Sequence, residues 1–192
     1  MDQLTSLQVA VIATDGVEES ELTQPVQALR GAGAKVVILT PGPNGIQTFR
    51  HHDKSITVDA ELPLAKTSPD AYDALFLPGG ALNADTLRAD QGVLEFIRAI
   101  QEAGKPIAAI CHAPRELIPA GLVRARKLTS YHTIQDDVRN AGGEWIDREV
   151  IVDRNWVTSR RPSDIPAFVR EMGALFSTAL KATTSARVTP HG

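Results

Sequence analysis

The chain has 192 residues, of which 43% are hydrophobic and 22% are charged, and its formal net charge is -3. These values are typical of a globular protein of one domain, and so weak a net charge gives no electrostatic reason to expect binding to nucleic acid or to an anionic membrane. One cysteine cannot form an internal disulfide, and the sequence shows neither a signal-peptide pattern nor an apolar run of the roughly 18 residues that a membrane span needs. We therefore expect a cytoplasmic protein.

The first forty residues predict a strand, a helix and a second strand. Gln8 to Thr14 and Lys35 to Thr40 are short apolar runs of the kind found in strands that are buried on both faces. Between them, Glu18, Glu19 and Glu21 cluster where a helix begins, and acidic residues in a first turn are favoured by the helix dipole. This order indicates a βαβ unit with parallel strands.

Residues 41–59 predict a surface hairpin instead. Two short alternating pieces, 46–50 and 55–58, flank the His51-His52 doublet. Adjacent residues of a strand point to opposite faces, and no cysteine or patterned carboxylate joins the two histidines. We interpret the doublet as a solvated turn and expect no metal site and no cofactor.

The middle of the chain predicts a third buried strand followed by two glycines. Tyr72 to Leu77 is apolar and leads into Pro78-Gly79-Gly80, where the absence of side chains lets the backbone pass close to another group and offer its N–H groups. Asn83 or Asp85 is a candidate cap for a short helical piece at 86–88, and Asp90 is a candidate cap for a clearer amphipathic helix that ends at Gly104.

The cysteine follows the next strand. Ile107 to Ile110 has no polar face, Cys111 comes directly after it, and Pro114 suits the first position of a new helix, which we expect to end near Gly121. A lone cysteine is more often a small buried hydrophobic residue than a nucleophile. Its place on a sharp strand-to-helix turn, beside His112, favours a nucleophile whose thiolate is stabilised by the helix start.

The last third predicts further strands and helices. Residues 127–130 form a short strand, 133–140 a helix, and 150–153 with 156–159 a hairpin. Asp164 precedes a long final helix that carries apolar residues on one face. Strands and helices that alternate with short loops indicate an α/β, doubly wound fold with a mostly parallel sheet and helices on both faces.

Three groups of candidate residues follow the carboxyl ends of predicted strands. They are the cluster from Glu18 to Glu21, the pair Gly79-Gly80, and Cys111-His112. Binding sites of doubly wound sheets lie outside the carboxyl ends of the strands. The three groups therefore predict one site.

Several ordered motifs resemble the ThiJ/PfpI superfamily, most closely its branch of PfpI-type intracellular proteases and general stress proteins. The motifs include Asp15-Gly16-x-Glu18-x-x-Glu21-Leu22, Leu77-Pro-Gly-Gly80, Ala109-Ile-Cys-His112 and Thr158-Ser-Arg160-x-Pro162-x-Asp164. The resemblance implies a flavodoxin-like sandwich in a single domain, similar to class I glutamine amidotransferases, over residues 1–181. Residues 182–192 have no pattern, and we expect a disordered tail there.

The resemblance also implies roles for individual residues. It makes Cys111 the nucleophile, His112 its acid or base, and Glu21 the carboxylic acid that hydrogen-bonds the nucleophile. The backbone N–H groups of Gly80 and His112 would bind an oxyanion. Relatives place a partner subunit's acid against the histidine, so we expect a homodimer or higher homo-oligomer. The usual glutamate is missing, and Asp85 is the nearest candidate.

Two functions from different classes remain open at this point. One is a cysteine hydrolase that acts on peptides, on glyoxals or on glycated adducts; the other is a stress-response redox sensor in which Cys111 is oxidised to sulfenic or sulfinic acid. Both need a reactive thiolate. A class I glutaminase is disfavoured, because neither His132 nor His191 belongs to the late His-x-Glu motif of those enzymes.

Overall fold

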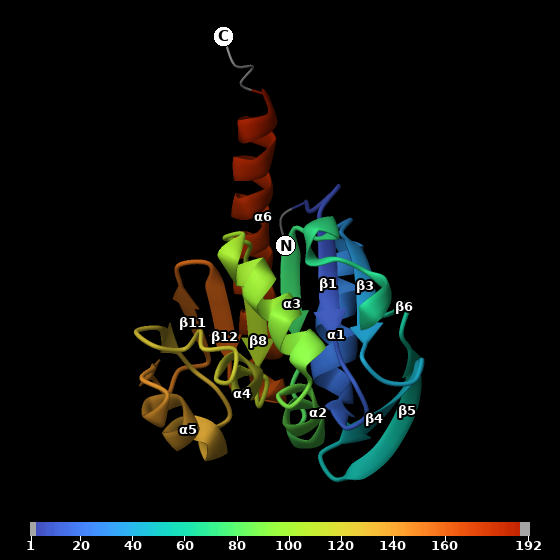
Figure 1. Cartoon of the computed structure of the whole chain (residues 1–192), viewed down its shortest axis with the longest axis vertical. Coiled ribbons are helices and arrows are strands. Elements are labelled where there is room, and N and C mark those ends of the chain that lie inside the picture. Colours follow the sequence, from blue (N-terminus) through green and yellow to red (C-terminus); the bar gives the residue numbers. More distant parts are fainter. Residues whose placement is uncertain (1–2, 189–192) are drawn as a thin grey trace.

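A seven-stranded sheet runs through the centre of the protein in the order β11-β12-β8-β7-β1-β3-β6 (Figure 1). The computed structural model describes the backbone of residues 3–188 and the side chains of residues 3–179. The strands are β1 (Gln8–Ile12), β3 (Lys35–Thr40), β6 (Leu62–Pro63), β7 (Ala74–Leu77), β8 (Ile107–Ile110), β11 (Val150–Asp153) and β12 (Trp156–Ser159). Every pair is parallel except β11 with β12, which form the predicted hairpin.

The central strands are apolar on both sides because helices cover both faces of the sheet. Every residue of β7 and β8 is buried. On one face α1 (Glu19–Gly31) and α6 (Ile165–Val188) contribute Leu29, Phe168 and Met172 to the core. On the other face α3 (Gln91–Glu102) contributes Ile97 and Ile100. The predicted doubly wound, flavodoxin-like α/β fold is confirmed.

Short elements connect these layers. They are the helices α2 (Ala81–Leu87), α4 (Pro114–Leu117) and α5 (Gln135–Asn140), the 3-10 helices η1 (Leu64–Lys66), η2 (Pro69–Ala71), η3 (His132–Ile134) and η4 (Pro162–Asp164), and the paired strands β9 (Lys127–Leu128) and β10 (Glu144–Trp145).

The hairpin predicted for residues 41–59 is present and is fastened to the start of α1. Strands β4 (Gly45–Arg50) and β5 (Asp53–Asp59) pair antiparallel, and β4 also pairs with β2 (Val17–Glu18). Glu19 accepts hydrogen bonds from the Arg50 guanidinium at 2.8 and 3.0 Å and from the Ser55 hydroxyl. Glu18 accepts one from the backbone N–H of His51 at 2.9 Å. His51 and His52 are exposed in the turn, as predicted.

Three predicted boundaries are wrong. Helix α2 begins at Ala81, directly after Gly80, and not near Thr86. Helix α4 has only four residues and ends before Gly121, because irregular turns take over after Leu117. Helix α6 continues to Val188, beyond the expected start of the tail at residue 182, because adding residues to an existing helix requires no new nucleation. The rest of the predicted tail, 189–192, lies outside the described residues.

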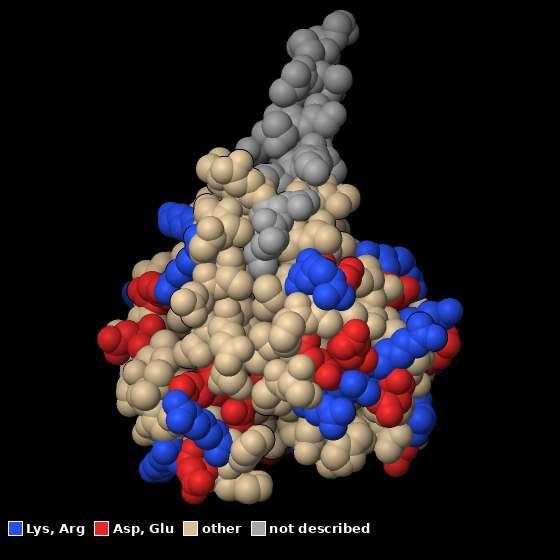
Figure 2. Space-filling model, turned by 180° about the vertical axis from the view of Figure 1, so that it is seen from behind, with Lys and Arg blue, Asp and Glu red and all other residues tan. Residues whose placement is uncertain are grey.

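Charged side chains of both signs are interspersed on the face drawn in Figure 2, without a large area of one sign among its described residues. Such a surface offers no concentrated field to a polyanion. Within residues 3–188, no helix is both long and apolar enough to cross a membrane.

Candidate active site

Cys111 has a left-handed backbone with φ of 63°, which is unusual for a residue other than glycine. It leaves β8 at the carboxyl end of the sheet. Its N–H donates to the carbonyl oxygen of Ser159 at 3.0 Å, and its own carbonyl accepts the N–H of Tyr131 at 2.8 Å. The two hydrogen bonds hold the sharp turn that was predicted after the strand.

The Pro78-Gly79-Gly80 turn at the end of β7 closes one side of the site. A Cβ atom on Gly79 would collide with Glu21 Oε2 and would lie 2.6 Å from Cys111 Cβ. At Gly80, where φ is 98°, a Cβ would collide with the carbonyl oxygen of Gly16 and lie 2.7 Å from the backbone nitrogen of Glu18. Only glycine allows this turn to pass so close to both Cys111 and the start of α1.

A buried amide fixes the glycine turn in place. Asn83 is fully buried; its Nδ2 donates to the carbonyl oxygens of Pro78 at 3.0 Å and Gly79 at 3.2 Å, and its Oδ1 accepts the N–H of Thr14 at 2.8 Å. The side chain therefore joins the loops after β1 and β7. Asn83 lies inside α2 and caps no helix, contrary to one of our predictions. The sequence did not reveal its positioning role, because an asparagine that joins two loops cannot be distinguished by sequence alone from one that caps a helix.

Of the three clustered glutamates, only Glu21 enters the site. It is fully buried, whereas Glu18 and Glu19 turn outward to the β4–β5 hairpin. Burial raises the pKa of Glu21 to about 8, with the Cys111 thiol and the Gly79 N–H acting in the opposite direction. Neither carboxyl oxygen has a well-formed hydrogen bond among the described residues. Near neutral pH the group is therefore mostly a neutral acid that lies against the thiol.

The expected stabilisation of the Cys111 thiolate is not found in the single subunit. Burial raises the pKa of the thiol, and negative charge on Glu21 raises it further, while the N–H groups of Gly80 and His112 lower it. The prediction relied on a helix dipole, and a four-residue α4 supplies little of one. At neutral pH the proton of Cys111 must therefore go to a neighbouring base when the sulfur reacts.

His112 is the neighbour that can accept this proton. Its Nδ1 lies 3.3 Å from Cys111 Sγ, and its Nε2 lies 3.3 Å from the hydroxyl of Thr133. The ring of Tyr131 lies against the imidazole, with 4.8 Å between the centroids. Burial, followed by the charges of Arg115 and His132, lowers the pKa of His112 to about 4. The imidazole is therefore neutral at pH 7, with one ring nitrogen available to accept a proton.

Asp85 does not contact His112 within this chain. It lies on α2 with an exposed side chain, and its Oδ1 is 3.3 Å from Nη2 of Arg115 on α4. The structure therefore brings together Cys111, His112, Glu21 and the N–H groups of Gly80 and His112, but not Asp85. Thr133, Tyr131 and Asn83 are nearby residues that the sequence did not single out as part of the site.

The assembled groups suit addition of sulfur to a carbonyl carbon. The site has one thiol, one neutral imidazole, one neutral carboxylic acid and two N–H groups that face the sulfur. Throughout the described residues, no group of three or more histidine, cysteine, aspartate or glutamate side chains is arranged to hold a metal ion.

Comparison with known sequences gives matches over most of the chain. The DJ-1/PfpI family matches residues 7–174. Protein/nucleic acid deglycase 2 of Escherichia coli is 42% identical over 167 residues, which cover 86% of this chain and 95% of that protein. A deglycase of Thermococcus kodakarensis is 41% identical over 165 residues, covering 86% and 96%. General stress protein 18 of Bacillus subtilis is 39% identical over 168 residues, covering 87% and 96%.

Solved structures give the same fold. DJ-1beta of Drosophila melanogaster superposes with a TM-score of 0.81 at 26% identity, covering 94% of this chain and 98% of the other. DJ-1 of Schizosaccharomyces pombe superposes with a TM-score of 0.79 at 20% identity, covering 96% and 100%.

Proposed function

Because the chain belongs to the DJ-1/PfpI family, and relatives of about 40% identity are named deglycases, we propose that it is a cysteine-dependent deglycase of the cytoplasm. Its substrates would be the adducts that glyoxals form with amino groups. The observation that carries this proposal is the contact of a buried thiol with a neutral base, 3.3 Å between Cys111 Sγ and His112 Nδ1, beside the protonated acid Glu21.

The first chemical step uses each of these groups once. Cys111 sulfur forms a bond to a carbonyl carbon of the adduct, the thiol proton passes to Nδ1 of His112, and the carbonyl π electrons move to oxygen. The N–H groups of Gly80 and His112 hold the resulting oxyanion, and Glu21 donates a hydrogen bond to it. Over the whole reaction one water is consumed, and a methylglyoxal adduct gives the free amine and a hydroxy acid, so no outside oxidant is required.

The burial of the nucleophile favours a small substrate over a peptide. Cys111 is only 6% exposed, so a folded or extended polypeptide cannot lie across the sulfur without rearrangement of the surrounding loops. A small dicarbonyl or its adduct places only one carbonyl carbon at the sulfur. We therefore place glyoxal-derived adducts ahead of peptides.

A redox sensor is the second candidate, and one observation favours it. The neutral carboxyl group of Glu21 has no well-formed hydrogen bond and lies against the sulfur, where it could donate a hydrogen bond to the oxygen of a sulfenic or sulfinic acid. A stress role would agree with the name of the relative General stress protein 18. Against this candidate, burial and a raised thiol pKa slow the reaction with peroxide.

One sample can separate the two functions. Release of amine from a methylglyoxal adduct of N-acetyl-lysine, cleavage of a fluorogenic peptide, and the rate of Cys111 oxidation by peroxide would be measured for the wild type and for Cys111→Ser. We expect adduct turnover that Cys111→Ser lowers at least about 1000-fold, and slow oxidation. Rapid peroxide oxidation without turnover would replace the deglycase proposal with the sensor. Turnover that survives in Cys111→Ser would contradict a cysteine-dependent deglycase.

We also propose a homodimer or a higher homo-oligomer in which Asp85 of one chain orients His112 of another. Support comes from the exposure of the Asp85 side chain, 65%, which leaves it open to a second copy. Within the described residues, the hydrogen-bond partner of Nε2 of His112 is the Thr133 hydroxyl, and no carboxylate takes that place. Mixing Cys111→Ser with Asp85→Ala subunits tests the arrangement: activity should recover in the mixture. No recovery, from inactive mutants that are shown to exchange subunits, would mean that Asp85 does not act across an interface.

A further inference from the structure

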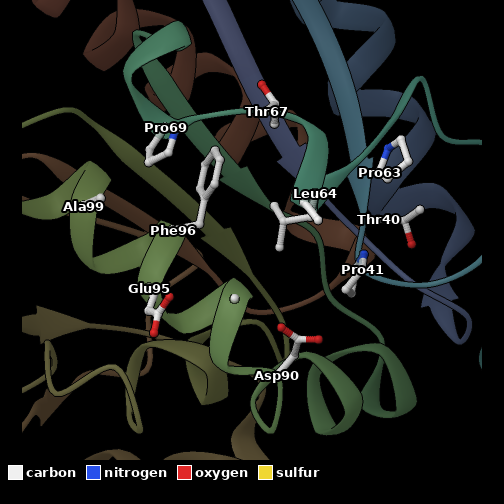
Figure 3. A pocket seen from close by; sticks show the side chains of 12 residues that line it. Thr40, Pro41, Pro63, Leu64, Thr67, Pro69, Asp90, Glu95, Phe96 and Ala99 are labelled. Carbon is white, nitrogen blue, oxygen red and sulfur yellow. The ribbon is translucent and has the colours of Figure 1, made fainter.

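A cleft of about 470 Å³ lies between the carboxyl end of β3 and helix α3 (Figure 3). It shares no residue with the candidate active site. Thr40 and Pro41 form one side, Pro63 and Leu64 another, and Phe96 and Ala99 of α3 a third. The volume falls within the range of about 300–1,000 Å³ that is typical of small-molecule pockets, and the position follows the rule that ligands bind outside the carboxyl ends of parallel strands.

The deep wall of the cleft is apolar and held by its own packing. Leu64 is 6% exposed and Phe96 is 4% exposed, and the Phe96 ring packs on Tyr72 with 5.9 Å between the centroids. The Tyr72 hydroxyl is itself 3.0 Å from that of Thr67, which also lines the cleft. The wall is therefore formed before a ligand arrives, so that binding does not require these side chains to be ordered.

The charged groups that line the cleft are both acids. Figure 3 shows the carboxyl groups of Asp90 and Glu95 on the same side of the cleft, at the start of α3. Asp90 Oδ1 accepts the N–H of Val93 at 3.0 Å, and its other oxygen has no hydrogen bond among the described residues. Glu95 has neither a hydrogen bond nor an ion pair within the described chain.

No cation of α3 neutralises these acids. The guanidinium of Arg98 donates instead to the carbonyl oxygens of Pro119 and Ala120, at 3.1 Å each. Lys105, just beyond the helix, donates from Nζ to the carbonyl oxygen of Pro69. A ligand in the cleft therefore meets an apolar wall and two carboxylates that form no ion pair within the described residues.

We propose that this cleft is a second binding site and that its ligand is a small organic cation with an apolar body, such as an arylalkylammonium ion. The apolar body lies against Leu64 and Phe96, and the ammonium group lies beside Glu95 and Asp90. A carboxylate ligand would be repelled by both acids, and a neutral one would gain no attraction from them. The inference is independent of the proposed deglycase activity.

Phenethylammonium is a suitable probe, and 3-phenylpropionate is its counterpart of opposite charge. Both would be titrated into the full-length protein while backbone amides are followed by NMR. We expect saturable shifts at Thr67, Gly92 and Phe96 with the cation at millimolar concentration, at least fivefold weaker binding of the anion, and no shift at Cys111. Glu95→Gln should weaken binding of the cation about two- to fivefold.

Glu102→Gln is the matched control, because Glu102 is exposed on the same helix but does not line the cleft. It removes the same charge from α3 and should leave the affinity unchanged. Equal binding of the two probes, equal effects of the two substitutions, or shifts confined to residues outside the cleft would each overturn the proposal.

Discussion

Among the described residues, two glutamates are fully buried without a well-formed hydrogen bond, and their surroundings differ. Glu21 lies on α1 against the thiol of Cys111 and the N–H of Gly79, while Glu116 lies on α4. Burial raises the pKa of both. For Glu21 a thiol and an N–H act against that rise; for Glu116 burial is the only cause. A buried acid thus becomes a candidate for catalysis through the reactive groups beside it, and not through burial alone.

The largest expected effect is a difference in adduct turnover between substitutions of Glu21 and of Glu116. Glu21→Gln keeps the shape of the side chain but replaces the acidic O–H, which donates to the oxyanion in the proposed step, by a weaker amide donor. We expect adduct turnover to fall at least about 10-fold, since complete loss of one oxyanion donor costs about 100- to 1000-fold. Glu116→Gln should leave turnover within about twofold. If the two substitutions lower kcat/KM equally, the distinction between the two acids is wrong.

The next effect compares two glycines of the chain: Gly79, which is packed tightly beside Glu21 and Cys111, and Gly31, which has open space around it. Gly79→Ala places a methyl group against Glu21 and Cys111, and we expect it to lower the free energy of unfolding by about 1–3 kcal/mol and to reduce turnover. Gly31→Ala is the control, because its methyl group would meet nothing within 4 Å. Replacing glycine by alanine near the end of α1 should raise stability by about 0.5–1 kcal/mol. Urea titrations of both variants measure the difference; an unaffected Gly79→Ala would contradict the close packing.

A smaller effect appears in the pH dependence of stability. A raised pKa means that the folded state holds its proton longer than the unfolded state, so the stability contributed by Glu21 is lost as pH rises from about 4.5 through about 8. His112, whose pKa is lowered to about 4, acts in the opposite direction below about 6.5.

Between pH 6.5 and 8, His112 no longer contributes to the pH dependence of stability, so this interval reports on Glu21 and Glu116. The free energy of unfolding of the wild type should fall across it. Glu21→Gln and Glu116→Gln should each flatten the fall, and the double variant should flatten it most. A wild-type stability that rises across this interval would show that neither acid is held protonated.

The smallest effect belongs to the outward-facing neighbour of Glu21. Glu19 pairs with the exposed Arg50, and such surface ion pairs contribute about 0–1 kcal/mol. Glu19→Gln should therefore change stability by less than about 1 kcal/mol and leave turnover unchanged. If it lowers turnover as much as Glu21→Gln does, the β4–β5 hairpin contributes to the site.

The sequence predicts the sheet well because buried parallel strands are short apolar runs. The runs at 35–40 and 107–110 match β3 and β8 residue for residue. The convergence of Glu21, Gly80 and Cys111 also follows from the sequence, since all three come after strands whose carboxyl ends share one edge.

What the sequence does not predict depends on contacts between distant segments. The burial of Glu116 is one example, because a glutamate in a short helix normally faces solvent. The upward shift of the Cys111 pKa is another example, because it depends on how deeply the thiol is buried and on where α4 ends. The outward turn of Glu19 depends on Arg50 and Ser55, which lie 31 and 36 residues later in the chain.

The left-handed backbone of Cys111 limits which amino acids can occupy position 111 in the folded protein, independently of their reactivity. Small and unbranched side chains adopt positive φ more readily than β-branched ones. A survey of all substitutions at position 111 should therefore yield folded protein with glycine, asparagine or serine and much less with valine, isoleucine or threonine. The backbone at position 111 therefore tolerates a hydroxyl in place of the thiol when serine supplies it, but not when threonine does.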